Sequence, residues 1–271
     1  MARAKRPKTK RIVALGDLHC GHAAGLTPPG WHGCQIGGPR FVALRAEMWR
    51  RYSELVDAIG PVHAVICNGD AIDGTGGRSG GTEQLTPDRD VQADMAVQCL
   101  TQWKPAAGYW LTYGTPYHTG DAEDWERVVC ERLHDRAHAH AEIHAEAWLD
   151  VNGCIIGAKH KVGSSSIPHG RHTAVSREHL WNIMWAERKA QPRGDILLRS
   201  HVHYYGGAFG AGWVAMTLPA LQSAATKYGG RQCSGTVDWG LVVIDVTDTG
   251  DWTWRAHTTE LAAVAAVPSK L

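Results

Sequence analysis

The residues best able to do chemistry in this sequence are Asp and His residues that directly follow short apolar runs. In the stretch VALGDLHCGH, Asp17 and His19 come after such a run and are two positions apart. On an extended segment, side chains at i and i+2 point to the same side, so Asp17 and His19 can bind one metal ion together. His201 and His203 repeat this spacing at the end of the run DILLRS.

Three further residues of metal-binding type follow other apolar runs. Asp70 ends an Asn-Gly-Asp sequence, and its carboxylate could bridge two ions. His118 lies in GTPYHTGD after a third run, and His160 closes the second strand of a predicted hairpin. Mixed imidazole and carboxylate ligation suits manganese, iron or zinc, whereas magnesium or calcium would want mostly oxygen ligands. Two such ions about 3.5–4 Å apart form a clamp for in-line displacement at phosphorus.

Short β-branched runs alternate with longer amphipathic segments, and this alternation predicts an α/β protein. Ligands of an open α/β sheet bind beyond the carboxyl ends of its strands, so the Asp and His residues above are expected to converge there. A βαβαβα order comes first, and mostly β-structure follows it. The predicted strands are 11–17, 63–70, 106–114, 195–203, 212–220, 240–247 and 251–258, and the predicted helices are 41–60, 86–103, 121–135 and 177–190.

Local signals predict how some of these elements begin and turn. Thr86 is expected to cap helix 86–103, with Pro87 at the first helical position. Asn152 and Gly153 lie between two strand-like runs and predict a β-hairpin with a two-residue turn. The His-rich segment 134–146 is interpreted as a solvated face and not as a metal site.

Five motifs, taken in order, resemble those of the calcineurin-like metallophosphoesterases. The resemblance covers nearly the whole chain and implies an α/β four-layer sandwich, in which two mostly β sheets pack together and are flanked by helices. It also implies that Asp70 bridges two divalent ions. The motifs are GDLH (16–19), GD (69–70), GTPYH (114–118), KH (159–160) and SHVH (200–203).

The same resemblance implies the remaining metal ligands and the reaction. One ion would be held by Asp17, His19 and His203, and the other by His160 and His201. Both would be divalent, with manganese expected first and iron, zinc or nickel as alternatives. A metal-bound hydroxide would attack the phosphorus of a phosphate ester in line.

The substrate class is less closely specified. The segments DLHCGHAAGLTPPGW and GTPYHTG resemble the corresponding segments of family members carried by phages and prophages. It favours a phosphodiesterase or nuclease, with nucleic acid as a candidate substrate. The alternatives are a phosphomonoesterase acting on a protein or a small molecule, and a catalytically inactive scaffold of the same fold.

The third motif departs from the family pattern. Thr115 stands where the family has an Asn ligand, and His118 comes three residues after it instead of next to it. Thr is a poor neutral ligand, so His118 or water could complete the second ion site. Alternatively, His118 keeps the family's role beside the phosphate and helps to protonate the leaving oxygen. The sequence leaves both alternatives open.

Other polar residues are candidates for supporting roles. Asp73, three residues after Asp70, could orient a ligand His. His22 lies in a Gly-flanked loop and is either a substrate contact or a plain loop residue. Cys20 is expected to be buried. A further set could lie over the phosphate, because an Arg fork suits phosphate oxygens. This set comprises His169, Arg171 and His172.

Composition limits the remaining possibilities. With 28 Lys and Arg against 27 Asp and Glu, the net charge of +1 gives no broad surface for nucleic acid or membranes. Residues 1–10 are expected to form a disordered basic tail, and 11–271 a single catalytic domain. No run is apolar enough to span a bilayer. Seven cysteines without a C-x-x-C pair fit a reducing cytoplasm, that of a host cell for a phage protein. No oligomeric state is predicted.

Overall fold

The computed structural model describes residues 8–119, 124–165, 167–232, 235–264 and 268–269. Most of the predicted basic tail lies outside these residues. Thr9 and Lys10, however, already belong to the first strand, so the folded part begins before residue 11.

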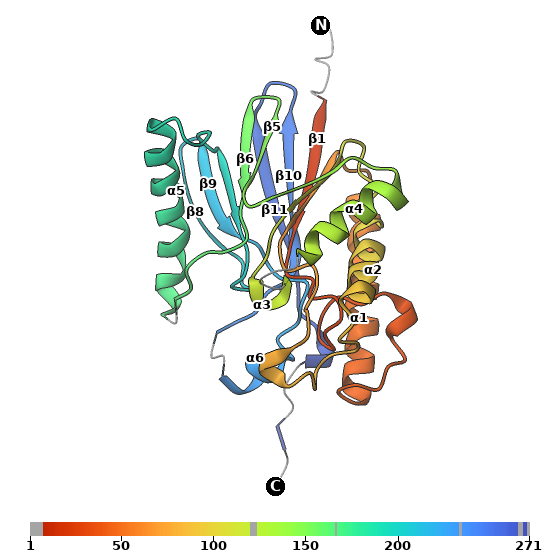
Figure 1. Cartoon of the computed structure of the whole chain (residues 1–271). Coiled ribbons are helices and arrows are strands. Elements are labelled where there is room, and N and C mark those ends of the chain that lie inside the picture. The colour runs from red at the N-terminus through yellow and green to blue at the C-terminus, as the bar shows by residue number, and fades with distance from the viewer. Residues whose placement is uncertain (1–7, 120–123, 166, 233–234, 265–267, 270–271) are drawn as a thin grey trace, which may run out of the picture.

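Two sheets form the centre of the molecule (Figure 1). The first has the strand order β11-β10-β1-β2-β3-β4, in which β1 to β4 run parallel and β10 and β11 are antiparallel additions. Its strands are β1 (Thr9–Leu15), β2 (Ala64–Asn68), β3 (Gly108–Thr112), β4 (Ala141–His144), β10 (Trp239–Thr247) and β11 (Trp252–Thr259).

The second sheet has the order β5-β6-β7-β9-β8, with a parallel centre and an antiparallel strand at each edge. Asn152 and Gly153 join its first two strands, and both have positive φ, so the predicted hairpin is confirmed. The strands are β5 (Ala147–Val151), β6 (Cys154–Ala158), β7 (Ile196–Arg199), β8 (Gly206–Gly210) and β9 (Trp213–Thr217).

Alternation along the strands places apolar side chains between the two sheets. Ile12 and Ile66 from the first sheet belong to the same buried cluster as Ile156 and Leu198 from the second. Side chains at alternate positions of a strand face opposite sides, so the neighbouring residues of these strands face the outer layers.

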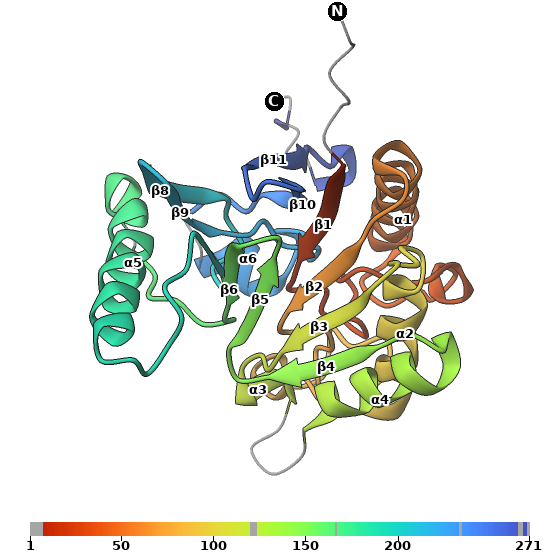
Figure 2. The same cartoon turned by 90° about the horizontal axis from the view of Figure 1, so that it is seen from above.

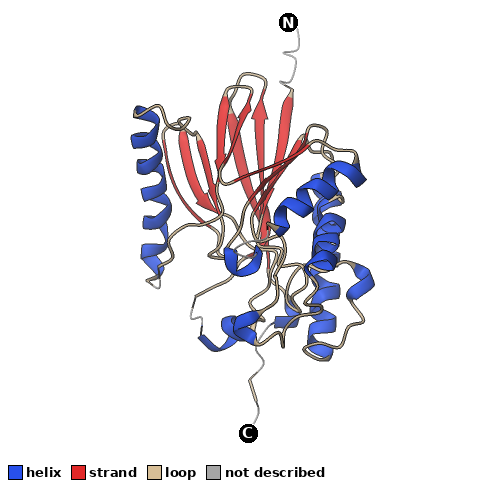
Figure 3. Cartoon of the chain, viewed as in Figure 1, coloured by secondary structure: helices blue, strands red, loops and turns tan. Residues whose placement is uncertain are grey.

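Helices cover both outer faces, as Figure 2 shows from above. Three of them cover the first sheet through a second buried cluster, and a single long helix covers the second sheet through a smaller one. The predicted four-layer sandwich is therefore confirmed (Figure 3). The first three are α1 (Pro39–Ile59), α2 (Arg89–Leu100) and α4 (Trp125–Ala137), and the long helix is α5 (Arg171–Glu187).

Short helical segments lie in the connections. Two of them are α-helical and four are 3-10 turns. They are α3 (Pro116–Thr119), α6 (Lys227–Gln232), η1 (Pro29–Trp31), η2 (Gly77–Ser79), η3 (Pro168–Gly170) and η4 (Ala262–Val264).

Several local expectations differ from the structure. Asp88 caps α2 by accepting hydrogen bonds from Asp90 N and Val91 N, so the prediction of Thr86 as the cap was wrong. Thr86 instead accepts a bond from Asp88 N. Strand β4 was not predicted because it lies within the His-rich segment 134–146. The four His residues of that segment are nevertheless exposed, as expected.

Strand β8 was missed because its sequence, GGAFG, is mostly glycine. Helix α5 begins at Arg171, six residues before the predicted start. No helix in the described part of the chain is long and apolar enough to cross a bilayer.

Candidate metal centre

The loops that follow β1, β2, β3, β6 and β7 meet at one end of the two sheets, near α3 in Figure 1. They bring together side chains that are far apart in the sequence. Within the described residues, three groups have ligand atoms that all lie within 4.8 Å of one another. The groups are Asp17, His19 and His203; His19, Asp70 and His118; and Asp70, His160 and His201.

The first group faces inward around Asp17. His203 Nε2 lies 3.2 Å from Asp17 Oδ1 and 3.3 Å from His19 Nε2, and His19 Nε2 is 3.9 Å from the same oxygen. Asp17 Oδ1 is buried and accepts no hydrogen bond. A buried carboxylate oxygen without a donor is costly unless a cation is bound, so this oxygen indicates a cation site.

The last group is arranged around Asp70. His160 Nε2 lies 3.0 Å from Asp70 Oδ2 but makes no hydrogen bond, although it is buried. His160 Nδ1 donates to Asn68 O at 2.8 Å, which leaves the Nε2 lone pair free in the neutral ring. Ligating histidines in proteins commonly have this arrangement, in which one ring nitrogen donates to oxygen and the other binds the metal.

Backbone conformation at the site is unusual. Asp17 (φ 49°), His19 (47°), Asp70 (50°), His201 (74°) and His203 (56°) all have positive φ. Residues other than Gly rarely adopt this conformation, and it concentrates at functional sites. The expectation of an extended segment was wrong both for Asp17 and His19 and for His201 and His203. Strand β1 ends at Leu15, and left-handed turns bring Asp17 and His19 together. Strand β7 ends at Arg199, and the two second-sheet histidines fall in different ligand groups.

Hydrogen bonds between backbones hold the first two ligand loops side by side. Asp17 N donates to Gly69 O, and His19 N donates to Asp70 O, each at 3.0 Å. The loop after β7 joins them because His201 N donates to Asp17 Oδ2 at 3.2 Å. The three loops therefore form one connected unit.

Asp73 contacts two of the clustered histidines. His19 Nδ1 donates to Asp73 Oδ1 at 2.9 Å, and His118 Nδ1 donates to Asp73 O at 2.8 Å. Gln84 donates to the other carboxylate oxygen of Asp73. Asp73 thus contacts both rings through oxygen atoms and could orient them if they bind a metal.

His118 lies on one side of the cluster only. Its Nε2 is 4.0 Å from Asp70 Oδ2, and its ring packs edge-on against His19 with the centroids 4.5 Å apart. His118 therefore groups with His19 and not with His160 and His201. In this geometry it does not complete the second ion site.

Thr115 contacts Asp70. Its backbone N–H donates to Asp70 Oδ1 at 2.7 Å, and its hydroxyl lies 3.2 Å from both carboxylate oxygens. The hydroxyl donates to a candidate ligand, so Thr115 helps to orient Asp70.

Electrostatics separate the histidines into two kinds. Burial and the neighbouring His118 lower the pKa of His19 to about 4, which keeps this ring neutral near pH 7. For His160 burial also opposes charge, but Asp70 outweighs it and raises the pKa to about 10. A proton and a metal ion compete for the same Nε2, so cation binding at His160 would release a proton.

The donor set fits divalent cations. Asp17, Asp70 and Asp73 are each at most 3% exposed. None of these three carboxylates pairs with a Lys or Arg among the described residues. Buried anions need a compensating charge, and with the surrounding imidazoles they provide the mixed ligation that transition metals favour.

Glu126 and Asn68 were not predicted as site residues. Glu126 accepts backbone hydrogen bonds from Ala71 and Gly114, while burial and then the charge of Asp70 raise its pKa to about 7. One sequence signal could have revealed it. Glu126 lies on the buried face of α4, an unusual place for an acid. Asn68 donates to Ser200 Oγ at 2.8 Å and so joins the two sheets below the site.

The residues proposed to contact substrate differ in their surroundings. Arg171 stacks on Tyr204, which follows His203, with its guanidinium carbon 4.3 Å from the ring centre. His169 is exposed, and His172 Nδ1 donates to Gly207 O.

The loop residues beside His19 are buried. His22 accepts a bond from Ala24 N and faces Glu83, so both of its ring nitrogens meet groups of the protein. Cys20 is also buried, as expected, with its thiol donating to Leu26 O.

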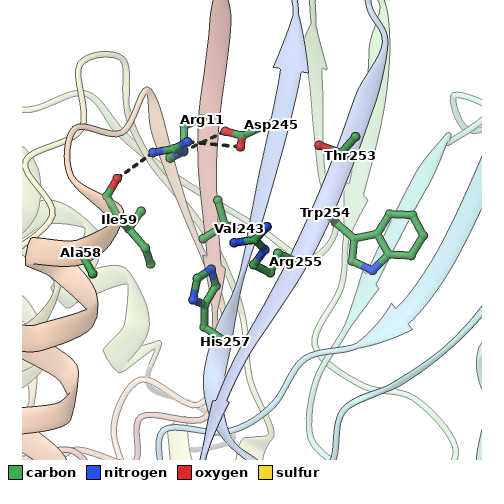
Figure 4. Close-up of a pocket in the computed structure, with 9 residues that line it drawn as sticks. All are labelled: Arg11, Ala58, Ile59, Val243, Asp245, Thr253, Trp254, Arg255 and His257. Atoms are coloured by element: carbon green, nitrogen blue, oxygen red, sulfur yellow. Dashed lines mark hydrogen bonds and ion pairs between the residues drawn. The ribbon is translucent and has the colours of Figure 1, made fainter.

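A separate hollow on the outer face of the first sheet contains none of these residues (Figure 4). Arg11 lines it, but its guanidinium already donates to Asp245 and to Ile59 O.

Among known proteins, similarity to this chain is found in solved structures. No protein-family model and no curated protein matches the chain. Among solved structures, it is similar to Vps29 from Cryptosporidium parvum, at 10% identity over 93% of this chain and 98% of that one, with a TM-score of 0.47.

Two other similar structures have comparable scores. For an archaeal phosphodiesterase the identity is 11%, with 91% and 99% of the two chains covered and a TM-score of 0.45. Vps29 from Entamoeba histolytica in complex with zinc is 14% identical over 92% of this chain and 98% of that one, with a TM-score of 0.41. Likeness at this level supports no inference about activity, and the fold assignment rests on the layers described above.

Proposed function

We propose that this chain is a metal-dependent phosphoesterase that cleaves phosphodiesters at a pair of divalent ions, with nucleic acid as the first candidate substrate and manganese as the first candidate metal. One observation carries the proposal. Two groups of ligand atoms, one around Asp17 and one around Asp70, lie next to each other and contain buried polar atoms without hydrogen-bond partners.

The ligand roles follow from these groups. Asp17, His19 and His203 would hold one ion, His160 and His201 the other, and Asp70 would lie between them. When bound, the ions would supply Lewis-acid stabilisation of the charge that develops on the phosphoryl oxygens and would lower the pKa of bound water.

His118 is the residue we assign to proton transfer. Its Nδ1 donates to Asp73 O, so the exchangeable proton of the charged ring is at Nε2, toward the cluster. Its side chain is 17% exposed, against 3% for His19 and 2% for His160, so a substrate oxygen can reach it. In this role His118 delivers a proton to the leaving oxygen.

Arg171 is the strongest candidate for holding the substrate. It stacks on Tyr204 and donates one bond to Thr236 Oγ1 at 2.8 Å. Its remaining N–H groups suit phosphate oxygens. His169 is a second candidate because it is exposed just before Arg171. His22 is a weaker candidate because protein groups face both of its ring nitrogens. His172 is weaker because its Nδ1 already donates to Gly207 O.

Model substrates test the proposal directly. With Mn²⁺ present, the chain should hydrolyse bis-p-nitrophenyl phosphate faster than p-nitrophenyl phosphate, and it should then cleave single- or double-stranded DNA. Preference for the monoester would identify a phosphomonoesterase instead. Metal binding without hydrolysis of either compound would point to an inactive scaffold. A phage origin and a cytoplasmic location in the host stay predictions of the sequence.

A further inference from the structure

Glu126, in the first turn of α4, connects two of the ligand loops from below. Its side chain is buried, with 1% of the residue exposed. One carboxylate oxygen accepts the N–H of Ala71 at 2.9 Å, and the other accepts the N–H of Gly114 at 2.5 Å. Ala71 directly follows Asp70, and Gly114 directly precedes Thr115.

A further hydrogen bond connects the same two loops, which follow β2 and β3. Thr115 N donates to Asp70 Oδ1 at 2.7 Å, so Asp70 and Thr115 touch one residue away from each bond to Glu126. The approach is so close that a Cβ on Gly114 would lie 2.1 Å from Asp70 Oδ1. A small change in the separation of the loops would therefore move the Asp70 carboxylate.

We propose that Glu126 is a positioning residue whose carboxylate sets the separation of the β2 and β3 loops and thereby aims Asp70 as the ligand shared by two cations. The inference rests on the cation site of the proposed function.

Packing alone does not account for an acid at this position. Glu126 lies on the same face of α4 as the buried residues Val129, Cys130 and Leu133, where an apolar residue would fill the space. An apolar side chain would, however, leave two buried N–H groups without an acceptor. Only a carboxylate offers two oxygens that can each accept one of them, since an amide offers an oxygen and an NH₂ group.

E126Q separates this role from packing because it keeps the size of the side chain. The Gln oxygen can accept one of the two N–H groups, but the NH₂ group faces the other. Mn²⁺ alone serves as the probe, with its affinity measured by calorimetry and its exchange coupling by electron paramagnetic resonance. Replacing a residue that supports a metal ligand typically weakens metal binding about 10- to 100-fold.

We therefore expect E126Q to bind Mn²⁺ about 10- to 100-fold more weakly than the wild type and to lose the signal of a coupled Mn²⁺ pair. E131Q is the matched control, because Glu131 is exposed on the same helix, and it should behave as the wild type. Unchanged affinity and coupling in E126Q, even with a lower melting temperature, would overturn the inference.

If E126Q does not fold, E126D is measured in its place. The shorter side chain keeps the charge but does not reach both N–H groups, so a weakened Mn²⁺ affinity is again expected and an unchanged one overturns the inference. The same measurements test the proposed function separately from the role of Glu126. A wild type that binds Mn²⁺ but hydrolyses no phosphate ester contradicts the activity, while the affinities still decide the role of Glu126. A wild type that binds no Mn²⁺ contradicts both.

Discussion

The two sheets contribute different chemistry to the site. The loops of the first sheet carry all the clustered carboxylates, Asp17, Asp70 and Asp73, together with His19 and His118. The loops of the second sheet carry only imidazoles among the candidate ligands, namely His160, His201 and His203. Negative charge therefore comes from one half of the sandwich and neutral donors from both, so that bound cations would link the two sheets at their open end.

The two halves also differ in how their ligands are supported. First-sheet ligands are held by their own network, in which Asp73, Gln84, Thr115 and Glu126 take part. Second-sheet ligands depend on the first sheet. His160 donates to Asn68 O, and His201 N donates to Asp17 Oδ2. A change in the first sheet should therefore cost more than the corresponding change in the second.

Asp70→Asn should have the largest effect. The substitution removes the charge shared by two ligand groups, and loss of metal-based charge stabilisation costs several kcal/mol, so hydrolysis of bis-p-nitrophenyl phosphate should fall about 1,000-fold. Steady-state kinetics measure the loss. D57N, at an exposed position on α1, is the control and should keep full activity. Activity of D70N within a few-fold of wild type would remove Asp70 from the centre of the site.

His201→Ala should cost less, because it removes a single neutral ligand from the second sheet. We expect hydrolysis to fall about 100-fold and the bound metal to drop toward one ion per chain. Kinetics and metal analysis are done on the same sample, with H134A on the exposed side of α4 for comparison. A loss in H201A larger than that in D70N would reverse the proposed ranking of the two sheets.

Thr115→Ala should have a smaller effect on the same reaction. It removes the hydroxyl contacts to Asp70 but keeps the backbone N–H bond. These contacts to the charged carboxylate are long, at 3.2 Å, and a typical hydrogen bond contributes about 1 kcal/mol, so we expect a loss of about fivefold in kcat/KM. An effect as large as that of D70N would mean that Thr115 binds a metal itself.

The smallest expected effect is a loss of folding stability at acid pH that originates at the second sheet. His179 is a residue of α5, and its ring stacks on Trp213 of β9. Burial, and then the nearby Arg193, lower the pKa of His179. Below the ordinary His pKa near 6.5 the unfolded chain binds a proton that the folded chain resists, so stability falls as the pH drops through this range. Thermal unfolding from pH 8 to pH 5 should show this loss in the wild type. A loss of the same size in H179Q would exclude His179 as its cause.

The sequence predicted that Asp and His side chains gather beyond the strands, because local apolar runs followed by polar residues mark where strands end. The strands β1, β2, β3 and β7 nevertheless end two to four residues before their predicted bounds. The left-handed backbone at Asp17, His19 and Asp70 was not predictable from spacing, since it is imposed by bonds between loops that come from different strands. Glu126 was missed for a related reason. Its partners Ala71 and Gly114 are 55 and 12 residues away, and only the packing of α4 brings them together.

The most direct test of the central claim is the metal content of the purified chain after loading with Mn²⁺ and removal of free ions. Elemental analysis should find about two ions per chain, because two ligand groups share the site and each draws donors from both sheets. A content of one ion or fewer would contradict a two-metal centre joining the sheets.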